Sequence, residues 1–206
     1  MRGTETSAAT VEWVMTELLR NPNIMSKAKV EVRTVAGENK QVDESNISKL
    51  PYLQAVIKET LRYHPPAPLI PRCKDGDDLE IGTYVIPKNA MVLINTWAIG
   101  RDSRIWANLD SFEPERFLSK DFELIPFGAG RRISCPGLAL AYRMVHLVVA
   151  SLIQNFDWKL EDGITPKEVD LNEKLGITAR KAIIVFGSAI CSVLFCVLEI
   201  EKEKQR

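Results

Sequence analysis

The chain has 206 residues and a hydrophobic content of 46%, enough to bury a substantial core in one domain. Its 27 basic and 27 acidic residues give a formal net charge of zero, which argues against a nucleic-acid partner held by bulk electrostatics. Four cysteines without a Cys-x-x-Cys pair, and only two histidines, argue against a zinc site. A reducing compartment is therefore the default expectation.

Helices are predicted in the first third of the chain. Apolar residues recur at helical spacing over residues 11–19, and Asn21-Pro22 ends that helix. Residues 23–35 have the pattern of a second helix, and residues 36–46 that of a polar loop. A third helix is predicted over residues 47–63, and its apolar line consists of Leu50, Leu53, Ile57 and Leu61.

Short strands are predicted next, because β-prone pieces alternate with turn residues. They cover residues 69–72, 79–81, 83–86 and 91–94, which together indicate a small sheet. Residues 97–118 should form a meandering connection, since Pro114 argues against continuous regular structure there.

A buried helix is predicted to follow residue 137 and to end near residue 155. Its apolar face is expected to comprise Leu138, Met144, Val145, Val148, Val149, Leu152 and Ile153. His146 lies in this helix and is interpreted as a hydrogen-bonded packing residue. Residues 156–160 should form a strand, followed by a polar stretch to residue 174.

The carboxyl end carries an apolar run at residues 182–198, between basic and acidic flanks. Two interpretations remain open for it: a strand or helix that covers exposed core, and a membrane anchor. The length of the run is at the lower edge of what a bilayer requires, about 17 to 25 residues. The predicted division is therefore a main domain at residues 1–181 and a divergent hydrophobic tail at residues 182–206.

The loop at residues 126–137, Pro-Phe-Gly-Ala-Gly-Arg-Arg-Ile-Ser-Cys-Pro-Gly, is the strongest candidate site. Its glycines allow a close approach of the backbone to a flat ligand. Cys135 precedes Pro136, which is expected in the first turn of the next helix, where free N–H groups stabilise negative charge on sulfur. The alternatives are a packing cysteine in a solvated turn, and a dinucleotide loop; the latter fails because Ile133 occupies the third glycine position.

Two further pairs of residues could carry chemistry. Thr6 and Ser7 lie near the start of the first helix, where their hydroxyls could cap it. The alternative is that Glu5 and Thr6 form an acid and alcohol pair that relays protons. Glu59 and Arg62 are three residues apart on one helix face, so they can form an ion pair.

In this order, the motifs resemble those in the C-terminal part of the cytochrome P-450 family, the haem-thiolate monooxygenases. The likeness is greatest to plant microsomal members similar to the geraniol hydroxylases of terpenoid metabolism. Residues 127–137 resemble the haem-binding signature, and residues 3–7 the oxygen-activating stretch of the central helix. Residues 59–62 resemble the Glu-x-x-Arg motif and residues 114–117 its partner. The implied fold is mainly α with small β-sheet pieces, the C-terminal haem-binding half of that family's fold.

The resemblance implies a role for each matching residue. Cys135 would be the axial thiolate ligand of the haem iron, and Phe127 would shield it from water. The other haem-binding residues would be Gly130 and Gly137 in the loop, with Arg132 and Arg72 at the propionates. Glu5 and Thr6 would move protons during catalysis. The buried ion network that fixes the meander under the haem would consist of Glu59, Arg62 and Arg116.

The resemblance also implies an activity and its partners. The reaction would be hydroxylation of a small apolar, terpenoid-like substrate, with electrons from NADPH delivered by a reductase flavoprotein. The location would be the cytosolic face of the endoplasmic reticulum membrane, or the cytosol because this chain shows no N-terminal anchor. Ile133 and Ser134 both lie between Arg132 and Cys135, where the family has one residue. The alternative is therefore a haem-free, truncated protein that acts only as an interaction partner.

Overall fold

The computed structural model describes residues 2–37, 41–73, 76–119, 124–128, 135–160, 164–174, 178–182 and 187–191. The helices are α1 (Arg2–Arg20), α2 (Pro22–Ala36), α3 (Pro51–Tyr63), α4 (Thr96–Ile99) and α5 (Leu138–Asn155), with short 3-10 helices η1 (Glu44–Lys49) and η2 (Pro114–Leu118). The strands are β1 (Leu69–Cys73), β2 (Leu79–Ile81), β3 (Tyr84–Ile86), β4 (Met91–Asn95), β5 (Phe156–Leu160), β6 (Glu173–Lys174), β7 (Arg180–Lys181) and β8 (Gly187–Cys191).

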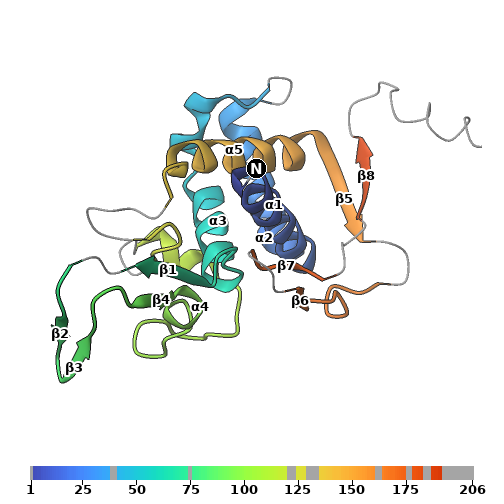
Figure 1. Cartoon of the computed structure of the whole chain (residues 1–206). Coiled ribbons are helices and arrows are strands. Elements are labelled where there is room, and N and C mark those ends of the chain that lie inside the picture. Colours follow the sequence, from blue (N-terminus) through green and yellow to red (C-terminus); the bar gives the residue numbers. More distant parts are fainter. Residues whose placement is uncertain are drawn as a thin grey trace, which may run out of the picture.

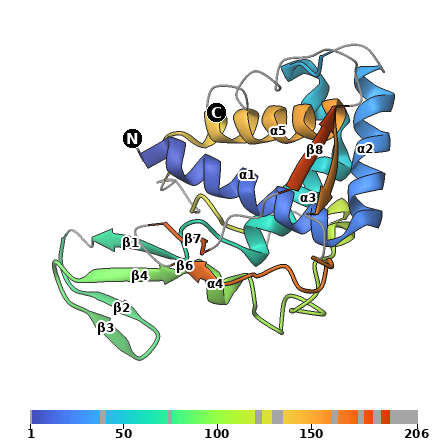
Figure 2. The same cartoon turned by 90° about the vertical axis from the view of Figure 1, so that its right-hand side faces the viewer.

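The main core lies where α5 packs across α1, α2 and α3 (Figures 1 and 2). Each helix contributes apolar side chains at three- and four-residue intervals, so one face of each meets the others. The most deeply buried of these side chains are Val14, Leu18, Ala28, Val32, Leu53, Val56, Val149 and Ile153. The predicted helices at residues 11–19 and 23–35 are confirmed, and so is the predicted apolar line of α3.

The face that α5 buries differs from the predicted one. Val145, Val149 and Ile153 are buried, but Met144 is 47% exposed and Val148 is 40% exposed. The prediction was wrong for these two because α1, α2 and α3 contact α5 from one side, and apolar character alone does not reveal which side. Within the described part of the chain, α5 is the helix with the length and composition to cross a bilayer.

The predicted helix at residues 47–63 is interrupted. Residues 44–49 form the 3-10 helix η1, and α3 begins only at Pro51. Pro51 has no backbone N–H to donate to a residue one turn earlier, whereas it suits the first position of a new helix. The predicted polar loop is correspondingly shorter, since α2 extends through Ala36 and η1 starts at Glu44.

The four predicted strands at residues 69–94 are present, but they form two separate ladders. β1 pairs antiparallel with β4, and β2 pairs antiparallel with β3. Gly82, with a φ of 61°, allows the tight turn that joins β2 to β3. Both ladders lie at the lower left in Figure 1, away from β5 and β8.

The described part of the carboxyl-terminal region forms two more antiparallel ladders, β5 with β8 and β6 with β7. The predicted strand at residues 156–160 is therefore confirmed. Strand β8 lies within the apolar run at residues 182–198, and residues 192–206 lie outside the described residues. The predicted domain boundary at residue 181 and the membrane-anchor interpretation stay predictions.

The close contact between the meander and α3 requires a glycine at position 100. Its φ of −67° is ordinary, so the requirement for glycine is steric: an added Cβ would lie 2.6 Å from the backbone oxygen of Arg62. We expect Gly100→Ala to lower the free energy of unfolding by about 1–3 kcal/mol, as overpacking does in other cores. Urea unfolding measures this change. Ser103→Ala, an exposed position in the same segment, is the control, and equal stability of both variants would contradict the prediction.

Candidate functional site

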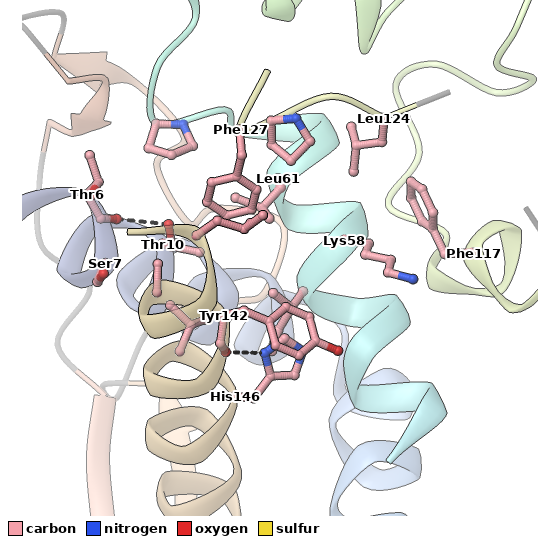
Figure 3. A pocket seen from close by; sticks show the side chains of 16 residues that line it. Thr6, Ser7, Thr10, Lys58, Leu61, Phe117, Leu124, Phe127, Tyr142 and His146 are labelled. Atoms are coloured by element: carbon pink, nitrogen blue, oxygen red, sulfur yellow. Dashed lines mark hydrogen bonds between the residues drawn. The ribbon is translucent and has the colours of Figure 1, made fainter. Parts of the chain in front are cut away.

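A cavity of about 330 Å³ lies between α1, α3, α5 and the segment that precedes α5 (Figure 3). Its walls are mainly apolar, with Leu61 from α3 and Phe127 from the preceding segment. The polar lining residues include Thr6 and Ser7 from α1 and Tyr142 and His146 from α5. The cavity therefore brings together elements that are up to 140 residues apart in sequence.

Thr6 and Ser7 lie inside a helix and not at its start. Helix α1 already begins at Arg2, so the predicted capping role is wrong. The backbone oxygen of Thr6 accepts a hydrogen bond of 2.9 Å from the hydroxyl of Thr10, one turn later. Thr10 also lines the cavity. Three hydroxyl-bearing residues of α1, namely Thr6, Ser7 and Thr10, therefore border the apolar space.

Glu5 is directed elsewhere. Its Oε1 lies 3.5 Å from Nη2 of Arg180 in β7, and Glu5 is not among the residues that line the cavity. Neighbouring residues of an α-helix point about 100° apart, so Glu5 and Thr6 face different surroundings. Of the predicted pair, Thr6 therefore lines the cavity, whereas Glu5 lies outside it and pairs with Arg180.

Cys135 lies three residues before α5 as a half-buried free cysteine. Its backbone oxygen accepts a bond of 3.3 Å from the N–H of Leu138. The helix starts at Leu138 with Gly137 as its N-cap, so the expectation that Pro136 occupies the first helical turn is wrong. An added Cβ on Gly137 would lie 3.9 Å from the Cys135 sulfur, an ordinary van der Waals contact, so Gly137 lies next to the thiol.

The remaining predicted haem-binding residues are only partly described. Phe127 lines the cavity, and the neighbouring Gly128 has a φ of 87°, a conformation that favours glycine. Arg72 lies in β1 opposite Val92 and is not part of the cavity lining. Gly130 and Arg132 lie outside the described residues.

A buried ion network stands beside the cavity. The carboxylate of Glu59 accepts two bonds of 2.8 Å from the guanidinium of Arg62, and both side chains are fully buried. Arg116 of η2 donates to the same carboxylate at 3.2 Å. The structure therefore brings together the three residues that were predicted to form this network.

The network also holds the meander by its backbone. Arg62 donates to the carbonyl oxygen of Gly100 at 2.8 Å and to those of Leu109 and Ser111 at 3.2–3.3 Å. The backbone N–H of Glu113 donates to Glu59 at 2.9 Å. Paired charges with further hydrogen bonds offset the cost of removing them from water.

His64 forms a second buried cluster that the sequence analysis missed. Its ring stacks on Trp13 with centroids 3.7 Å apart, and its Nε2 lies 2.9 Å from Oε1 of Glu17. Its Nδ1 lies 3.1 Å from Oε1 of Glu173. The two carboxylate partners are 47 and 109 residues away in sequence, so no local pattern could have indicated them.

His146 is buried as predicted, but only one of its nitrogens is hydrogen-bonded. Nδ1 lies 2.6 Å from the backbone oxygen of Tyr142, whereas Nε2 has no partner among the described residues. Burial lowers the pKa of His146 to about 4, so the ring is neutral at pH 7. The prediction of a hydrogen-bonded packing residue was therefore half right.

The fold and the site combine a mainly helical core, a free cysteine just ahead of one helix, and a threonine-bearing helix beside an apolar cavity. The family profile described as Cytochrome P450 matches residues 1–186. The chain belongs to the cytochrome P450 family, whose members bind haem through a cysteine thiolate. The resemblance and the fold class predicted from the sequence are confirmed.

Individual relatives agree with this assignment. Cytochrome P450 76AD1 of Beta vulgaris is 54% identical over 187 residues, covering 87% of this chain and 37% of that protein. Geraniol 8-hydroxylase of Swertia mussotii is 53% identical over 187 residues, covering 87% of this chain and 38% of that protein. The chain thus spans less than two fifths of the length of these relatives.

A solved structure supports the fold. A zebra fish cytochrome P450 bound to abiraterone superposes with a TM-score of 0.82 at 29% sequence identity. The superposition covers 91% of this chain and 44% of the zebra fish chain. Most of the present chain therefore corresponds to a part of that larger fold.

Proposed function

We propose that the chain is the haem-binding part of a monooxygenase that hydroxylates a small apolar, terpenoid-like substrate. Electrons would come from NADPH through a reductase flavoprotein, at the cytosolic face of the endoplasmic reticulum membrane. Two of the relatives are named geraniol 8-hydroxylase, which supports the substrate class. The reductase and the location rest on family resemblance.

One observation carries the proposal: Thr6 from α1, Phe127 from the loop and the start of α5 converge on a single apolar cavity. Cys135, which precedes α5, is a half-buried free thiol next to Gly137. Cys135 is not among the lining residues, but the apolar walls suit the faces of a flat, mainly apolar ring, and a cysteine thiolate is a ligand for the metal at its centre. The residues present are therefore compatible with haem.

Each residue has a defined task in this proposal. Cys135 would supply the thiolate that binds the haem iron, and Phe127 would keep water from the sulfur. Gly130 and Gly137 leave room for the backbone to approach the ring. Arg132 and Arg72 pair with the propionates, because a guanidinium binds a carboxylate through two parallel hydrogen bonds. When bound, haem supplies the oxygen chemistry, and the chain supplies binding and orientation.

Proton movement is assigned to α1. The hydroxyl of Thr6 borders the cavity and can both accept and donate a proton. Glu5 precedes it in the helix, with its carboxylate half exposed and paired with Arg180. We place Glu5 at the solvent side of this relay, where a carboxylate can exchange protons with water, and Thr6 at the cavity side.

The ion network has a mechanical task. Glu59, Arg62 and Arg116 tie α3 to η2 and to the meander between them. Phe117 of η2 lines the same cavity that Leu61 of α3 borders. The network thereby fixes two walls of the cavity relative to each other, and we propose that it keeps the haem site in shape.

The test is the absorption spectrum of the reduced, carbon-monoxide-treated protein after haem is supplied in excess. We expect the Soret shift that marks thiolate ligation, and we expect Cys135→Ala to abolish it, because no other residue replaces the sulfur there. Cys73→Ala is the matched control, since Cys73 is a free, exposed cysteine in β1.

The opposite outcomes would favour a haem-free interaction partner. The proposal fails if the wild-type protein shows no thiolate spectrum, or if Cys135→Ala retains it. Deletion of Ser134 adds a second arm, because it restores the spacing of the family. Equal haem affinity with and without Ser134 would show that the loop accommodates the extra residue.

A further inference from the structure

One face of α5 is apolar although it points away from the helical core. Leu140, Met144 and Val148 are 64%, 47% and 40% exposed. They follow one another at four-residue intervals, so they share one face of the helix. The buried residues of α5 lie on the other side, against α1, α2 and α3. An exposed apolar stripe of this kind indicates a contact surface.

A groove of about 270 Å³ continues this stripe at the carboxyl end of α5. Val148 belongs to both, and Leu152 and Phe156 extend the apolar lining to the first residue of β5. The groove, called the α5 groove below, is lined by Leu147, Val148, Ser151, Leu152, Asn155 and Phe156. It therefore ends where the chain passes from α5 into β5.

Strand β8 brings the carboxyl-terminal tail to this point. β8 pairs antiparallel with β5, and the register sets Cys191 opposite Phe156. Figures 1 and 2 show β8 running towards the end of α5 that joins β5. The chain after Cys191 thus starts beside a residue that lines the α5 groove. The family profile matches residues 1–186, so β8 and the tail lie beyond that match.

The tail has the composition and the length to cover this surface. Residues 192–198 read Ser-Val-Leu-Phe-Cys-Val-Leu, and charged residues follow from Glu199. Seven extended residues reach up to about 23 Å. Met144 lies twelve residues before Phe156, about 18 Å along α5 at 1.5 Å per residue.

The pairing of β8 argues against a membrane anchor. β8 takes residues 187–191 from the middle of the apolar run at residues 182–198. The seven apolar residues that follow are far fewer than the roughly 17 to 25 that a bilayer requires. Burial against an apolar surface of the same chain is the alternative that a run of this length can satisfy.

We propose that residues 192–198 fold back onto α5 and cover the α5 groove and the exposed face as far as Met144. The charged residues from Glu199 onwards stay in water. This docking needs neither haem nor Cys135, so its test is independent of the proposed monooxygenase activity.

The first experiment observes the methionine methyl groups of the full 206-residue chain by ¹³C NMR. Phe195 is the sole aromatic residue after residue 191, and its ring shifts the resonance of a methyl group that it contacts. Phe195→Leu should move the Met144 resonance by more than its linewidth. Met91 in β4, which is 68% exposed, is the control and should not move. A Met144 resonance that stays in place would contradict the proposal.

The second experiment links thiols with a short bismaleimide and maps the products by peptide mass spectrometry. In Val148→Cys, the introduced thiol should be joined to Cys196 of the same chain, which mixing with ¹⁵N-labelled protein establishes. Tyr84→Cys is the control, because Tyr84 is 77% exposed in the β2–β3 ladder and lies away from β8 (Figure 1). It should give no link to Cys196.

Two other results would assign the apolar surfaces to different partners. Links to Cys196 that form only between labelled and unlabelled chains would show that a second copy covers α5. No link, together with co-sedimentation of the chain with phosphatidylcholine vesicles, would assign the run to a lipid surface. Either result, or the absence of any link to Cys196 in Val148→Cys, overturns the proposal.

Discussion

Replacing Arg62 with methionine is expected to lower the free energy of unfolding by about 3–5 kcal/mol, the usual cost of breaking a buried ion pair. Methionine keeps much of the apolar stem but removes all the guanidinium donors. The Glu59 carboxylate would then remain buried with Arg116 as its charged partner. The carbonyl oxygens of Gly100 and Leu109 would lose their Arg62 donor, and that of Ser111 would keep only a bond of 3.4 Å from Arg116.

Chemical unfolding in urea, followed by circular dichroism, measures this loss. Arg104→Met is the matched control, because the Arg104 side chain is 87% exposed and its pair with Asp102 lies at the surface. Exposed pairs contribute about 0–1 kcal/mol, so the control should remain close to the wild type. Arg62→Lys separates charge from geometry, since lysine keeps the charge but cannot form the forked contact. A loss below 1 kcal/mol for Arg62→Met would show that the network does not stabilise the fold.

The second large effect concerns acid stability. Burial lowers the pKa of His146 to about 4, below the ordinary value of 6.5. Between these pH values the unfolded chain binds a proton that the folded protein rejects, so stability falls as the pH is lowered through this window. The slope attributable to His146 is about 1.4 kcal/mol per pH unit, which accumulates to about 3 kcal/mol by pH 4.

The measurement is a series of urea unfolding curves between pH 7.5 and pH 4.5. His146→Gln should lose stability less steeply than the wild type, because glutamine does not titrate. Other titrating groups affect both proteins, so the difference between the two curves isolates His146. For Arg104→Met, the free energy of unfolding should change with pH in the same way as it does for the wild type. If the free energies of unfolding of His146→Gln and the wild type differed by the same amount at every pH, burial would not shift the pKa of His146.

Local patterns predicted much of the fold. The helices α1 and α2, the apolar line of α3 and the strand positions follow from spacing and turn residues within short windows. The break at Pro51 was missed, although proline at the start of a helix was the available signal. Which side of α5 faces the core was misjudged at Met144 and Val148, because the packing of three distant helices decides it.

The candidate site was predictable where short motifs carry it. Glu59, Arg62 and Arg116 meet as expected, and Thr6 and Phe127 share one cavity. Two features could not be predicted. One is the pairing of Glu5 with Arg180 of β7, and the other is the lack of a partner for Nε2 of His146 among the described residues. Both are set by tertiary contacts between segments far apart in sequence.

The way in which Arg62 holds the meander has an evolutionary consequence. It binds the carbonyl oxygens of Gly100, Leu109 and Ser111, atoms that nearly every amino acid provides. Side chains along this segment can therefore change without loosening the attachment, provided that the path of the main chain is kept. Relatives can diversify the outer surface of the meander while the arginine remains fixed, with Gly100 as the exception because of its missing Cβ.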